Sequence, residues 1–519
     1  MAAYAGVLFV FAAFVASGSL LDDPFIFSRY ADNFLQNGDL LWNLGEPRVE
    51  GFSSWAWLGI HALGLKLGFH PVGFSRVVGT LFGATYAALF VAALRRRVGA
   101  WMAAAFGILG ALAPDLWFYA ASGMDVILWT LASWIWLGWF ARSVRLTVGH
   151  VAAAGALLLV RPEAMLLLGI CALRAMLEIR AGKNPVRGTI RALLVGSAVP
   201  AVLLGVRFAL FGQWVANSVA AKHLGGSPIL RMLSGLEYVA AVGQVFLLPS
   251  VAMVAVALAA GKGVGNAADV LESASSRLVS ACGAFVVLTI AMVVAAGGDD
   301  TSAFPFARLF VPVLGPLAYC LAVGVETVVV DARRRRMASG VLLCLFLVTF
   351  LPRAKAALKL SAEATNMSTV GGMLASIRER EAPGPSAAST YLVRETPQGE
   401  VVALPWAGRI PYETRLTTID LLGLNDRHIA SLPTPQRGID VKYDPDYVLR
   451  RRPYFICESI ALRAAPADIA KMNADELFAG GAWKLGQRKL VQDPRFTTGY
   501  ELDPVGSELT GGTCFRRRA

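Results

Sequence analysis

The sequence predicts a polytopic α-helical membrane protein with about eleven membrane helices, followed by a soluble C-terminal α/β domain. The chain has 519 residues, of which 56% are hydrophobic and only 16% are charged, whereas soluble domains carry roughly 25% charged residues. The apolar residues form long runs up to about Leu351, and residues 353–519 have the composition of an ordinary polar domain. The basic residues also follow a pattern that is typical of membrane topology.

Many apolar runs are long enough to cross a bilayer core of about 30 Å, which needs ~20 residues per helix. The predicted spans are approximately residues 3–21, 74–94, 101–119, 124–141, 149–161, 163–178, 191–211, 236–260, 278–296, 309–330 and 338–352. The two short spans on either side of Pro162 are also compatible with half-helices that do not each cross fully. We therefore expect a transmembrane domain at 1–352 and a soluble domain at 353–519.

The charge of the chain indicates its orientation in the membrane. The net charge is +12, which first suggests a nucleic-acid partner. However, the loops that alternate onto one side hold 16 basic and four acidic residues, an excess equal to the whole net charge. Basic residues concentrate in cytoplasmic loops. We therefore expect a multi-pass membrane protein with a cytoplasmic N-terminus, an outer C-terminal domain and no nucleic-acid partner.

The first outer loop, residues 22–73, is unusually long for a loop between two spans. Its apolar segment Trp55–Phe69 contains His61 and Lys66. We interpret this segment as a helix that lies along the membrane surface. If it crossed the membrane, every later basic loop would face the opposite side.

The C-terminal domain mixes helical and strand patterns. Ser361–Glu381 is predicted to be a helix, and Val401–Leu404 and Tyr454–Cys457 are predicted to be short strands between turns that carry Pro and Gly. Cys457 and Cys514 are the only cysteines of this domain. An oxidising exterior would permit a disulfide between them, but their spacing alone does not establish one.

Two adjacent carboxylates, Asp22 and Asp23, directly follow the first predicted span. Ionisable groups at a membrane boundary are costly to desolvate, so they point to function when a solvated helix end does not explain them. One of the pair is a candidate general base that takes the proton from an acceptor hydroxyl, and the other would help to shift its pKa. We lean to Asp22 as the base, with Asp23 orienting the acceptor or a bound cation.

Further charged residues lie at the predicted outer ends of the spans. Arg161, Lys222 and Arg308 are placed on the outer side, where together they are candidates to bind a phosphate. Any one of them alone is better explained as a snorkelling interface residue. Arg161 and Glu163 are also compatible with simple mutual pairing. Candidates for a second acid are Asp115, Asp125, Asp299 and Asp300. The sequence has no paired-cysteine metal site and no HExxH motif.

Several segments together resemble a known superfamily. They are Asp22–Ala31, Gly38–Asn43, Arg48–Ser53, Arg161–Glu163, Asn217–Lys222, Gly297–Asp300, Arg308–Phe310, Ile410–Tyr412 and Ile419–Asp426. In this combination the chain resembles the GT-C glycosyltransferases, and most of all the bacterial membrane arabinofuranosyltransferases of cell-wall assembly. The resemblance extends over most of the chain and implies a GT-C-like bundle.

The resemblance implies an inverting glycosyltransferase with a polyprenyl-phosphate sugar as donor and a cell-envelope glycan or glycolipid as acceptor. By it, the base is Asp22 or Asp23, and the lipid phosphate is bound by Arg161, Lys222, His223 and Arg308. Glu50, Glu163 and Asn217 would support the site. No cofactor is required, although a divalent cation is compatible with the chemistry.

Two alternatives remain open from the sequence. The same ionisable residues would suit a transporter or a flippase for lipid-linked substrates, although such proteins often carry internal helix repeats, and none is evident here. Alternatively, the chain is a transferase for mannose or another hexose rather than arabinofuranose.

Overall fold

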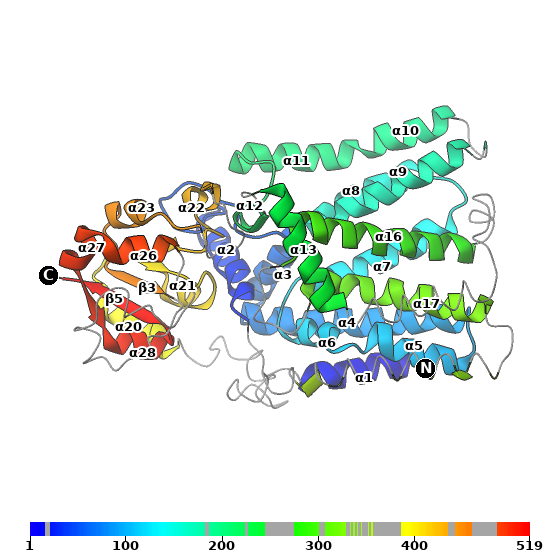
Figure 1. The fold of residues 1–519 in the computed structure, drawn as a ribbon, viewed down its shortest axis with the longest axis horizontal. Helices are drawn as coiled ribbons and strands as arrows, with labels where there is room; N and C mark the ends of the chain where they lie inside the picture. Colours follow the sequence, from blue (N-terminus) through cyan, green and yellow to red (C-terminus); the bar gives the residue numbers. More distant parts are fainter. Residues whose placement is uncertain are drawn as a thin grey trace.

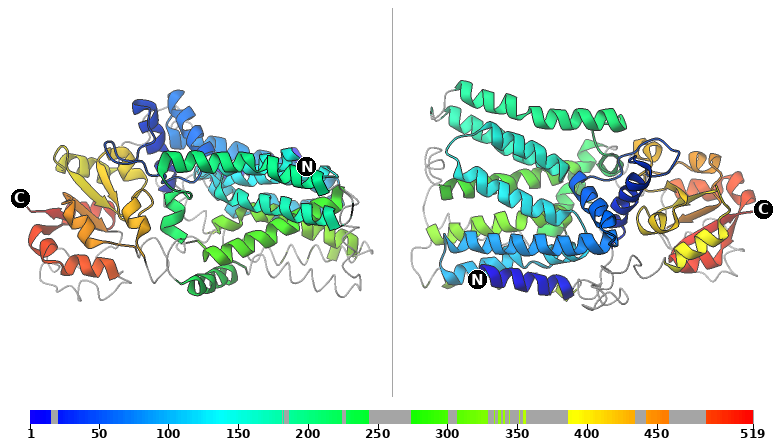
Figure 2. Two further views of the ribbon diagram at one scale, coloured as in Figure 1. Left: turned by 90° about the horizontal axis from the view of Figure 1, so that it is seen from above. Right: turned by 180° about the vertical axis from the view of Figure 1, so that it is seen from behind.

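The computed structural model describes residues 1–15, 21–180, 182, 186–223, 227–243, 274–299, 307–328, 386–433, 442–458 and 485–518, with scattered single residues between 333 and 355. Long helices run side by side in one bundle, and a smaller domain with a β-sheet lies at one end of it (Figure 1). Figure 2 shows the same division from two other directions. The predicted domain boundary at residues 352 and 353 lies outside the described residues and stays a prediction.

Four helical segments of the described residues are long and apolar enough to cross a membrane. They are α4 (Pro71–Arg95), the α10–α11 stretch (Val186–Phe211, with α10 at Val186–Gly196 and α11 at Ala198–Phe211), Ser276–Ala296 of α16 (Ala274–Ala296), and Arg308–Thr327, which joins η3 (Arg308–Val313) to α17 (Leu314–Val328). A fifth is formed if α5 (Ala100–Ala111) and α6 (Pro114–Ala121), bent by 45°, count as one span. The chain is therefore a helical membrane protein, and the number of eleven spans stays a prediction.

Other predicted spans correspond to shorter helices or fall outside the described residues. The shorter helices are α1 (Ala2–Val15), α7 (Val126–Arg142), α8 (Val148–Ala156) and α9 (Met165–Arg180). The predicted span 236–260 is described only at its start, by the end of α13 (Pro228–Gly243), and nearly all of 338–352 lies outside the described residues.

The helical path is broken around Arg161, as expected from the proline that follows it. Two single turns, η1 (Leu157–Leu159) and η2 (Pro162–Ala164), flank an Arg161 whose backbone is extended at φ −158° and ψ 148°. A residue before proline avoids the helical region because the proline ring crowds it. Arg161 therefore lies in an extended conformation between two helical turns, and its side chain lines the cavity described below.

Small residues let the bundle helices approach closely. Phe9 of α1 is fully buried against Gly83 of α4, where an added Cβ atom would lie 2.2 Å from the phenyl ring. Similarly, a Cβ at Gly110 of α5 would lie 2.5 Å from the ring of Phe90. Close packing over small residues is a main source of helix association in lipid.

Residues 22–73, the predicted first outer loop, contain two helices, α2 (Asp23–Asn37) and α3 (Trp55–Lys66). Pro24 stands in the first turn of α2, where proline is favoured, and Gly38 ends the helix with φ 73°. The Ser54 side chain accepts a hydrogen bond from the backbone N–H of Trp57 at 3.1 Å and so caps α3. The predicted helix in Trp55–Phe69 is present; its position relative to a membrane surface stays a prediction.

The C-terminal domain contains a five-stranded mixed sheet with the strand order β2-β1-β3-β5-β4. The strands are β1 (Val401–Leu404), β2 (Thr417–Asp420), β3 (Phe455–Glu458), β4 (Tyr500–Asp503) and β5 (Thr513–Arg517). β1 is parallel to β2 and β3, and β5 is antiparallel to β3 and β4. The prediction of β1 is confirmed in full, and that of β3 is shifted by one residue.

Short helices lie around this sheet, and the α/β class of the whole domain stays a prediction. They are α20 (Ala387–Glu395), α21 (Arg409–Thr414), α22 (Arg427–Ser431), α23 (Pro445–Arg450), α26 (Leu485–Gln492), α27 (Pro494–Gly499) and α28 (Pro504–Thr510). Cys457 of β3 lies opposite Cys514 of β5, and the two form a disulfide. The helix predicted at Ser361–Glu381 lies outside the described residues.

Candidate functional site

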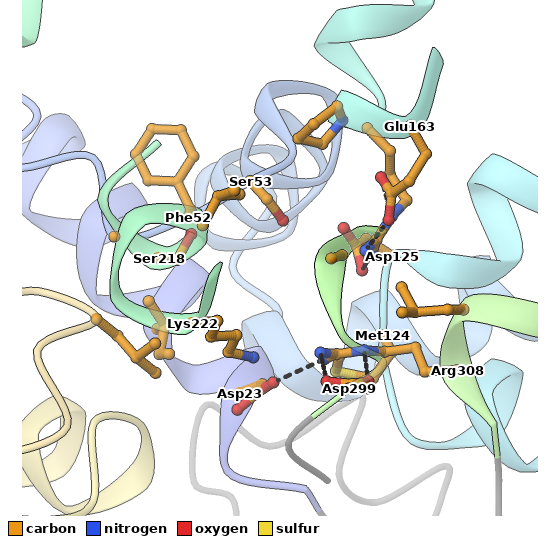
Figure 3. A pocket seen from close by; sticks show the side chains of 18 of the residues that line it. Asp23, Phe52, Ser53, Met124, Asp125, Glu163, Ser218, Lys222, Asp299 and Arg308 are labelled. Atoms are coloured by element: carbon orange, nitrogen blue, oxygen red, sulfur yellow. Dashed lines mark hydrogen bonds and ion pairs between the residues drawn. The ribbon is translucent and has the colours of Figure 1, made fainter. Parts of the chain in front are cut away.

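A cavity of about 360 Å³ lies where the bundle meets the first outer loop and the C-terminal domain (Figure 3). Its walls come from α2, the segment after Glu50, the turn before α7, η2, α9, α16, η3 and the short helix α12 (Asn217–His223). The C-terminal domain contributes Leu424. The polar residues of the lining are Asp23, Ser53, Asp125, Arg161, Glu163, Ser218, Lys222, Asp299 and Arg308. Seven of these nine are site residues predicted from the sequence.

The adjacent carboxylates Asp22 and Asp23 have different surroundings. Both carboxylate oxygens of Asp22 point to the C-terminal domain, where they accept hydrogen bonds from the backbone N–H groups of Gly408 and Arg409, each at 2.7 Å. Burial raises the pKa of Asp22 to about 6, and the neighbouring Asp23 adds to this. Asp23 lines the cavity, and 40% of its side chain is exposed. The geometry therefore favours Asp23 over Asp22 as the group that meets a substrate.

Arg308 joins Asp23 to a second carboxylate. Its Nη1 atom lies 3.2 Å from Asp23, and its Nε and Nη2 atoms each lie 3.1 Å from an oxygen of Asp299 (Figure 3). Two parallel bonds of this kind fix the plane of a guanidinium. Asp115 is buried and accepts a hydrogen bond from the backbone N–H of Ala307 at 3.3 Å. The segment that leads into η3 is thus fixed next to the cavity.

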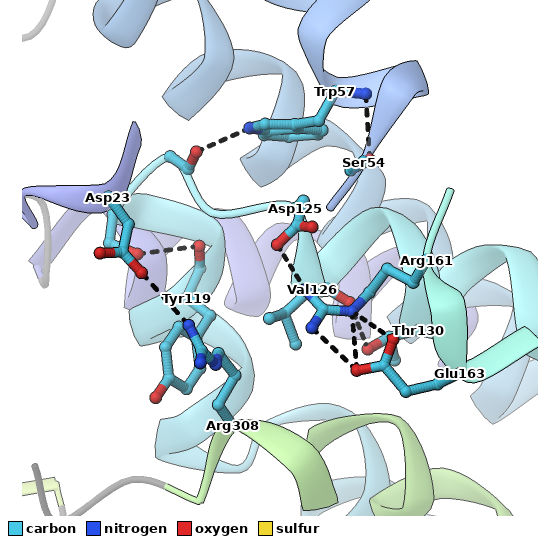
Figure 4. A network of polar contacts seen from close by, with 12 residues as sticks. Asp23, Ser54, Trp57, Tyr119, Asp125, Val126, Thr130, Arg161, Glu163 and Arg308 are labelled. Atoms are coloured by element: carbon cyan, nitrogen blue, oxygen red, sulfur yellow. Dashed lines mark hydrogen bonds and ion pairs between the residues drawn. The ribbon is translucent and has the colours of Figure 1, made fainter. Parts of the chain in front are cut away.

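Arg161 is surrounded by two other acids of the cavity. Its Nη1 atom lies 2.6 Å from Asp125 and its Nη2 atom 2.8 Å from Glu163 (Figure 4). The pairing of Arg161 with Glu163 that the sequence left open is therefore present, and Asp125 extends it. A buried arginine with two carboxylate partners has little capacity left for a phosphate. Its predicted role as a phosphate ligand stays a prediction.

Lys222 differs from both arginines because no ion pair or hydrogen bond of its ammonium group is found among the described residues. It lies on α12, lines the cavity, and points its ammonium end toward Asp23 and Arg308 in Figure 3. The neighbouring Ser218 has a buried hydroxyl that also lacks a hydrogen-bond partner in the described part of the chain. A lysine and a hydroxyl left unsatisfied at one wall are suited to an anionic ligand.

The charges of the cavity divide into two halves. Around Lys222, the two cations Lys222 and Arg308 face the two acids Asp23 and Asp299, so this half is neutral when all four are ionised. Around Arg161, one cation faces two acids. The Lys222 half is therefore the less negative of the two and opposes an anionic ligand less than the Arg161 half does.

The remaining predicted residues support the cavity or lie outside the description. Glu50 is buried and pairs with Arg207 at 2.8 Å, and its second oxygen accepts a bond from the indole N–H of Trp55 at 2.8 Å. Asn217 binds backbone carbonyls of the C-terminal domain. Asp300 is outside the described residues, as is the side chain of His223. Within the described chain, no group of three or more His, Cys, Asp or Glu residues is arranged to hold a metal ion.

Sequence reasoning did not identify Ser218 or Leu424 as part of the site. Ser218 has a sequence signal, because it stands inside the Asn217–Lys222 segment. Leu424 has no signal of its own, since a leucine becomes part of a wall only when another domain places it there.

Comparisons with known proteins add the following findings. A family model described as a domain of unknown function, DUF8728, matches residues 375–501, within the C-terminal domain. The structure is similar to that of ArnT from Cupriavidus metallidurans bound to undecaprenyl phosphate, with 14% identity, 87% of this chain and 92% of that chain covered, and a TM-score of 0.48. It is also similar to ArnT from Cupriavidus metallidurans in the apo state, with 15% identity, 89% and 93% coverage, and a TM-score of 0.46. No curated protein matches the chain.

Proposed function

We propose that the protein is a membrane glycosyltransferase that moves a sugar from a polyprenyl-phosphate donor to a hydroxyl group of an extracytoplasmic acceptor. The observation that carries this proposal is the placement of Asp23 beside Lys222 and Arg308 in one cavity at the end of the membrane helices. A carboxylate that accepts a proton and cations that receive a phosphate are the two groups this transfer needs.

The proposed reaction is a single displacement with inversion. The acceptor oxygen bonds to the anomeric carbon while the bond from that carbon to the phosphate oxygen breaks. The acceptor proton passes to Asp23, and the electron pair of the broken bond leaves with the polyprenyl phosphate. Lys222 would bind that phosphate. Arg308 lies beside Asp23 and would stabilise the negative charge of both the Asp23 carboxylate and the leaving phosphate.

The identity of the sugar rests on the sequence resemblance. It favours arabinofuranose as the sugar and a cell-envelope glycan as the acceptor, with mannose or another hexose as the alternative. The positive-inside pattern supports a cytoplasmic N-terminus and an outer C-terminal domain in the bacterial inner membrane. A polyprenyl carrier suits this location, because nucleotide sugars are not present outside the membrane.

Turnover by the purified protein in lipid nanodiscs tests the proposal. Polyprenyl-phosphoryl arabinofuranose and polyprenyl-phosphoryl mannose are each supplied with an acceptor glycan, with and without EDTA. We expect a new glycosidic bond with one donor, and the EDTA arm decides whether a divalent cation takes part. Lipid-linked sugar that crosses a proteoliposome membrane chemically unchanged would instead identify a flippase.

A further inference from the structure

The C-terminal domain contacts the segments that carry the polar residues of the cavity, and it does so through residues outside the strands of its sheet. The carboxylate of Asp22 is bound by the first N–H groups of the segment that enters α21, at Gly408 and Arg409. A Cβ atom at position 408 would lie 1.9 Å from the backbone oxygen of Asp22, so only glycine fits this contact. Because Asp23 is the next residue, this contact fixes the start of α2 beside the cavity.

A second contact is made by the loop between β2 and α22. Asp420 accepts hydrogen bonds from both the backbone and the side-chain N–H groups of Asn425, at 2.8 and 3.0 Å, and so fixes the amide of Asn425. The amide oxygen then lies 3.2 Å from the hydroxyl of Tyr30 on α2, which also accepts a bond from the N–H of Gly51 at 3.1 Å. A Cβ atom at Gly51 would lie 1.7 Å from Asn425 Oδ1.

A third contact joins this loop to α12, the helix that carries Lys222. The side-chain amide of Asn217 donates to the carbonyls of Gly423 and Leu424 at 2.8 and 3.0 Å. The backbone N–H of Asn217 donates to the carbonyl of Glu50 at 2.9 Å. The ammonium group of Lys442 in turn donates to the carbonyl of Ala220 at 3.1 Å. Thus the first residue and the middle of α12 are attached to the C-terminal domain.

These contacts are buried and directional, and each ends one or a few residues from a side chain of the cavity. Asp23 follows Asp22, Phe52 and Ser53 follow Gly51, and Leu424 itself forms part of the wall. A contact that only joined two domains would not need to be concentrated on the segments that carry the proposed base and the free lysine.

We propose that the C-terminal domain is a positioning domain, which places Asp23 through the contact of Asp22 with Gly408 and places Lys222 through Asn217. This inference rests on the proposed function. The two contacts act on different groups, so they predict different kinetic effects. Disturbing the Asp22 contact displaces the base and lowers kcat, whereas disturbing Asn217 displaces Lys222 and weakens donor binding.

The experiment compares variants of the full-length protein in nanodiscs. Asn217→Asp removes the donor group and Asn217→Gln keeps it, while Gly408→Ala introduces the clash with Asp22, and Asp22→Asn is the milder second variant. The matched control is Glu400→Gln, which removes the 2.6 Å ion pair with Arg517 inside the same domain, away from the cavity. Each variant is measured for kcat, donor KM, undecaprenyl phosphate affinity and hydrogen–deuterium exchange in residues 22–37 and 217–223.

We expect Gly408→Ala and Asp22→Asn to lower kcat by up to about 10²-fold with little change in donor KM, because displacements near 1 Å have effects of that size. We expect Asn217→Asp to weaken lipid-phosphate binding about tenfold, in line with a lost charge-assisted bond at Lys222, and to raise exchange in 217–223. Asn217→Gln should recover part of the affinity.

Equal losses in all variants, Glu400→Gln included, would show that the domain only stabilises the chain and would overturn the proposal. Unchanged kinetics and exchange in Gly408→Ala, Asp22→Asn and Asn217→Asp would overturn it as well. If the wild-type protein transfers no sugar, the proposed function fails, and lipid-phosphate affinity together with exchange still decides whether Asn217 positions Lys222.

Discussion

Replacing Lys222 by methionine is the most direct test of the phosphate site. The change keeps the length and the apolar stem of the side chain and removes only its charge. The side chain lines the cavity, and no ion pair of its ammonium is found in the described part of the chain, so the change leaves no carboxylate there without its partner. Replacing Arg161 or Arg308 would instead leave the acids that pair with each arginine without their counter-ion.

The expected loss follows from one charge-assisted hydrogen bond between an ammonium and a phosphate. Such a bond contributes roughly 1.5–3 kcal/mol, which corresponds to about a tenfold to hundredfold rise in the Kd of the lipid phosphate. The other charges around Lys222 are Arg308 against Asp23 and Asp299, so the loss of Lys222 leaves this half of the cavity net negative. This net negative charge favours the upper part of the range.

Isothermal titration of undecaprenyl phosphate into the nanodisc-embedded protein measures this effect. Lys66→Met is the matched control, since Lys66 is an exposed lysine in the last turn of α3 and is not part of the cavity. We expect the control to bind like the wild type and Lys222→Met to bind at least tenfold more weakly. A Kd within twofold of the wild type for Lys222→Met would refute the assignment of the phosphate to this lysine.

Three further predictions follow from the same structure. Asp23→Asn should lower transfer by roughly 10²–10⁴-fold without loss of undecaprenyl phosphate binding, and a variant that retains turnover would exclude Asp23 as the base. Burial raises the pKa of Asp420 to about 7. Between the ordinary aspartate pKa and about 7, the folded state keeps this carboxyl protonated and the unfolded state does not, so the stability of the fold decreases as the pH rises through this range. The melting temperature of the wild type should therefore fall relative to that of Asp420→Asn from pH 5 to pH 7.5. An unchanged difference between the two proteins would contradict the assignment. Reduction of the Cys457–Cys514 disulfide, whose ends are 57 residues apart, should destabilise the C-terminal domain by typically ~2–4 kcal/mol, and a denaturant midpoint that does not change with reductant would show that the bond contributes nothing.

The composition and the hydrophobic pattern of the sequence were sufficient to predict a helical membrane protein and many of its helices and strands. The hydrophobic runs identified α4, α16 and the Arg308–Thr327 segment, because the length of a span is set by the bilayer and not by neighbouring helices. The strand β1 was identified in full, since its apolar run is bounded by turn residues. The charged residues of the cavity were also found from the sequence, because an ionisable residue beside an apolar run is costly unless it has a role.

The tertiary structure determined which partner each of these charged side chains has and which of them face the cavity. Adjacent residues at the start of a helix point in directions about 100° apart, so the sequence alone cannot say which of Asp22 and Asp23 faces the cavity. That choice is made by the N–H groups of Gly408 and Arg409, which lie more than 380 residues further along the chain and bind Asp22. Likewise, Lys222 and Arg161 look equivalent as basic residues of outer segments, and only the packing gives Arg161 two carboxylate partners and leaves Lys222 unpaired within the described chain. Local sequence sets the cost of each charge near the membrane, whereas the partner that offsets this cost comes from distant segments that only the folded chain brings together.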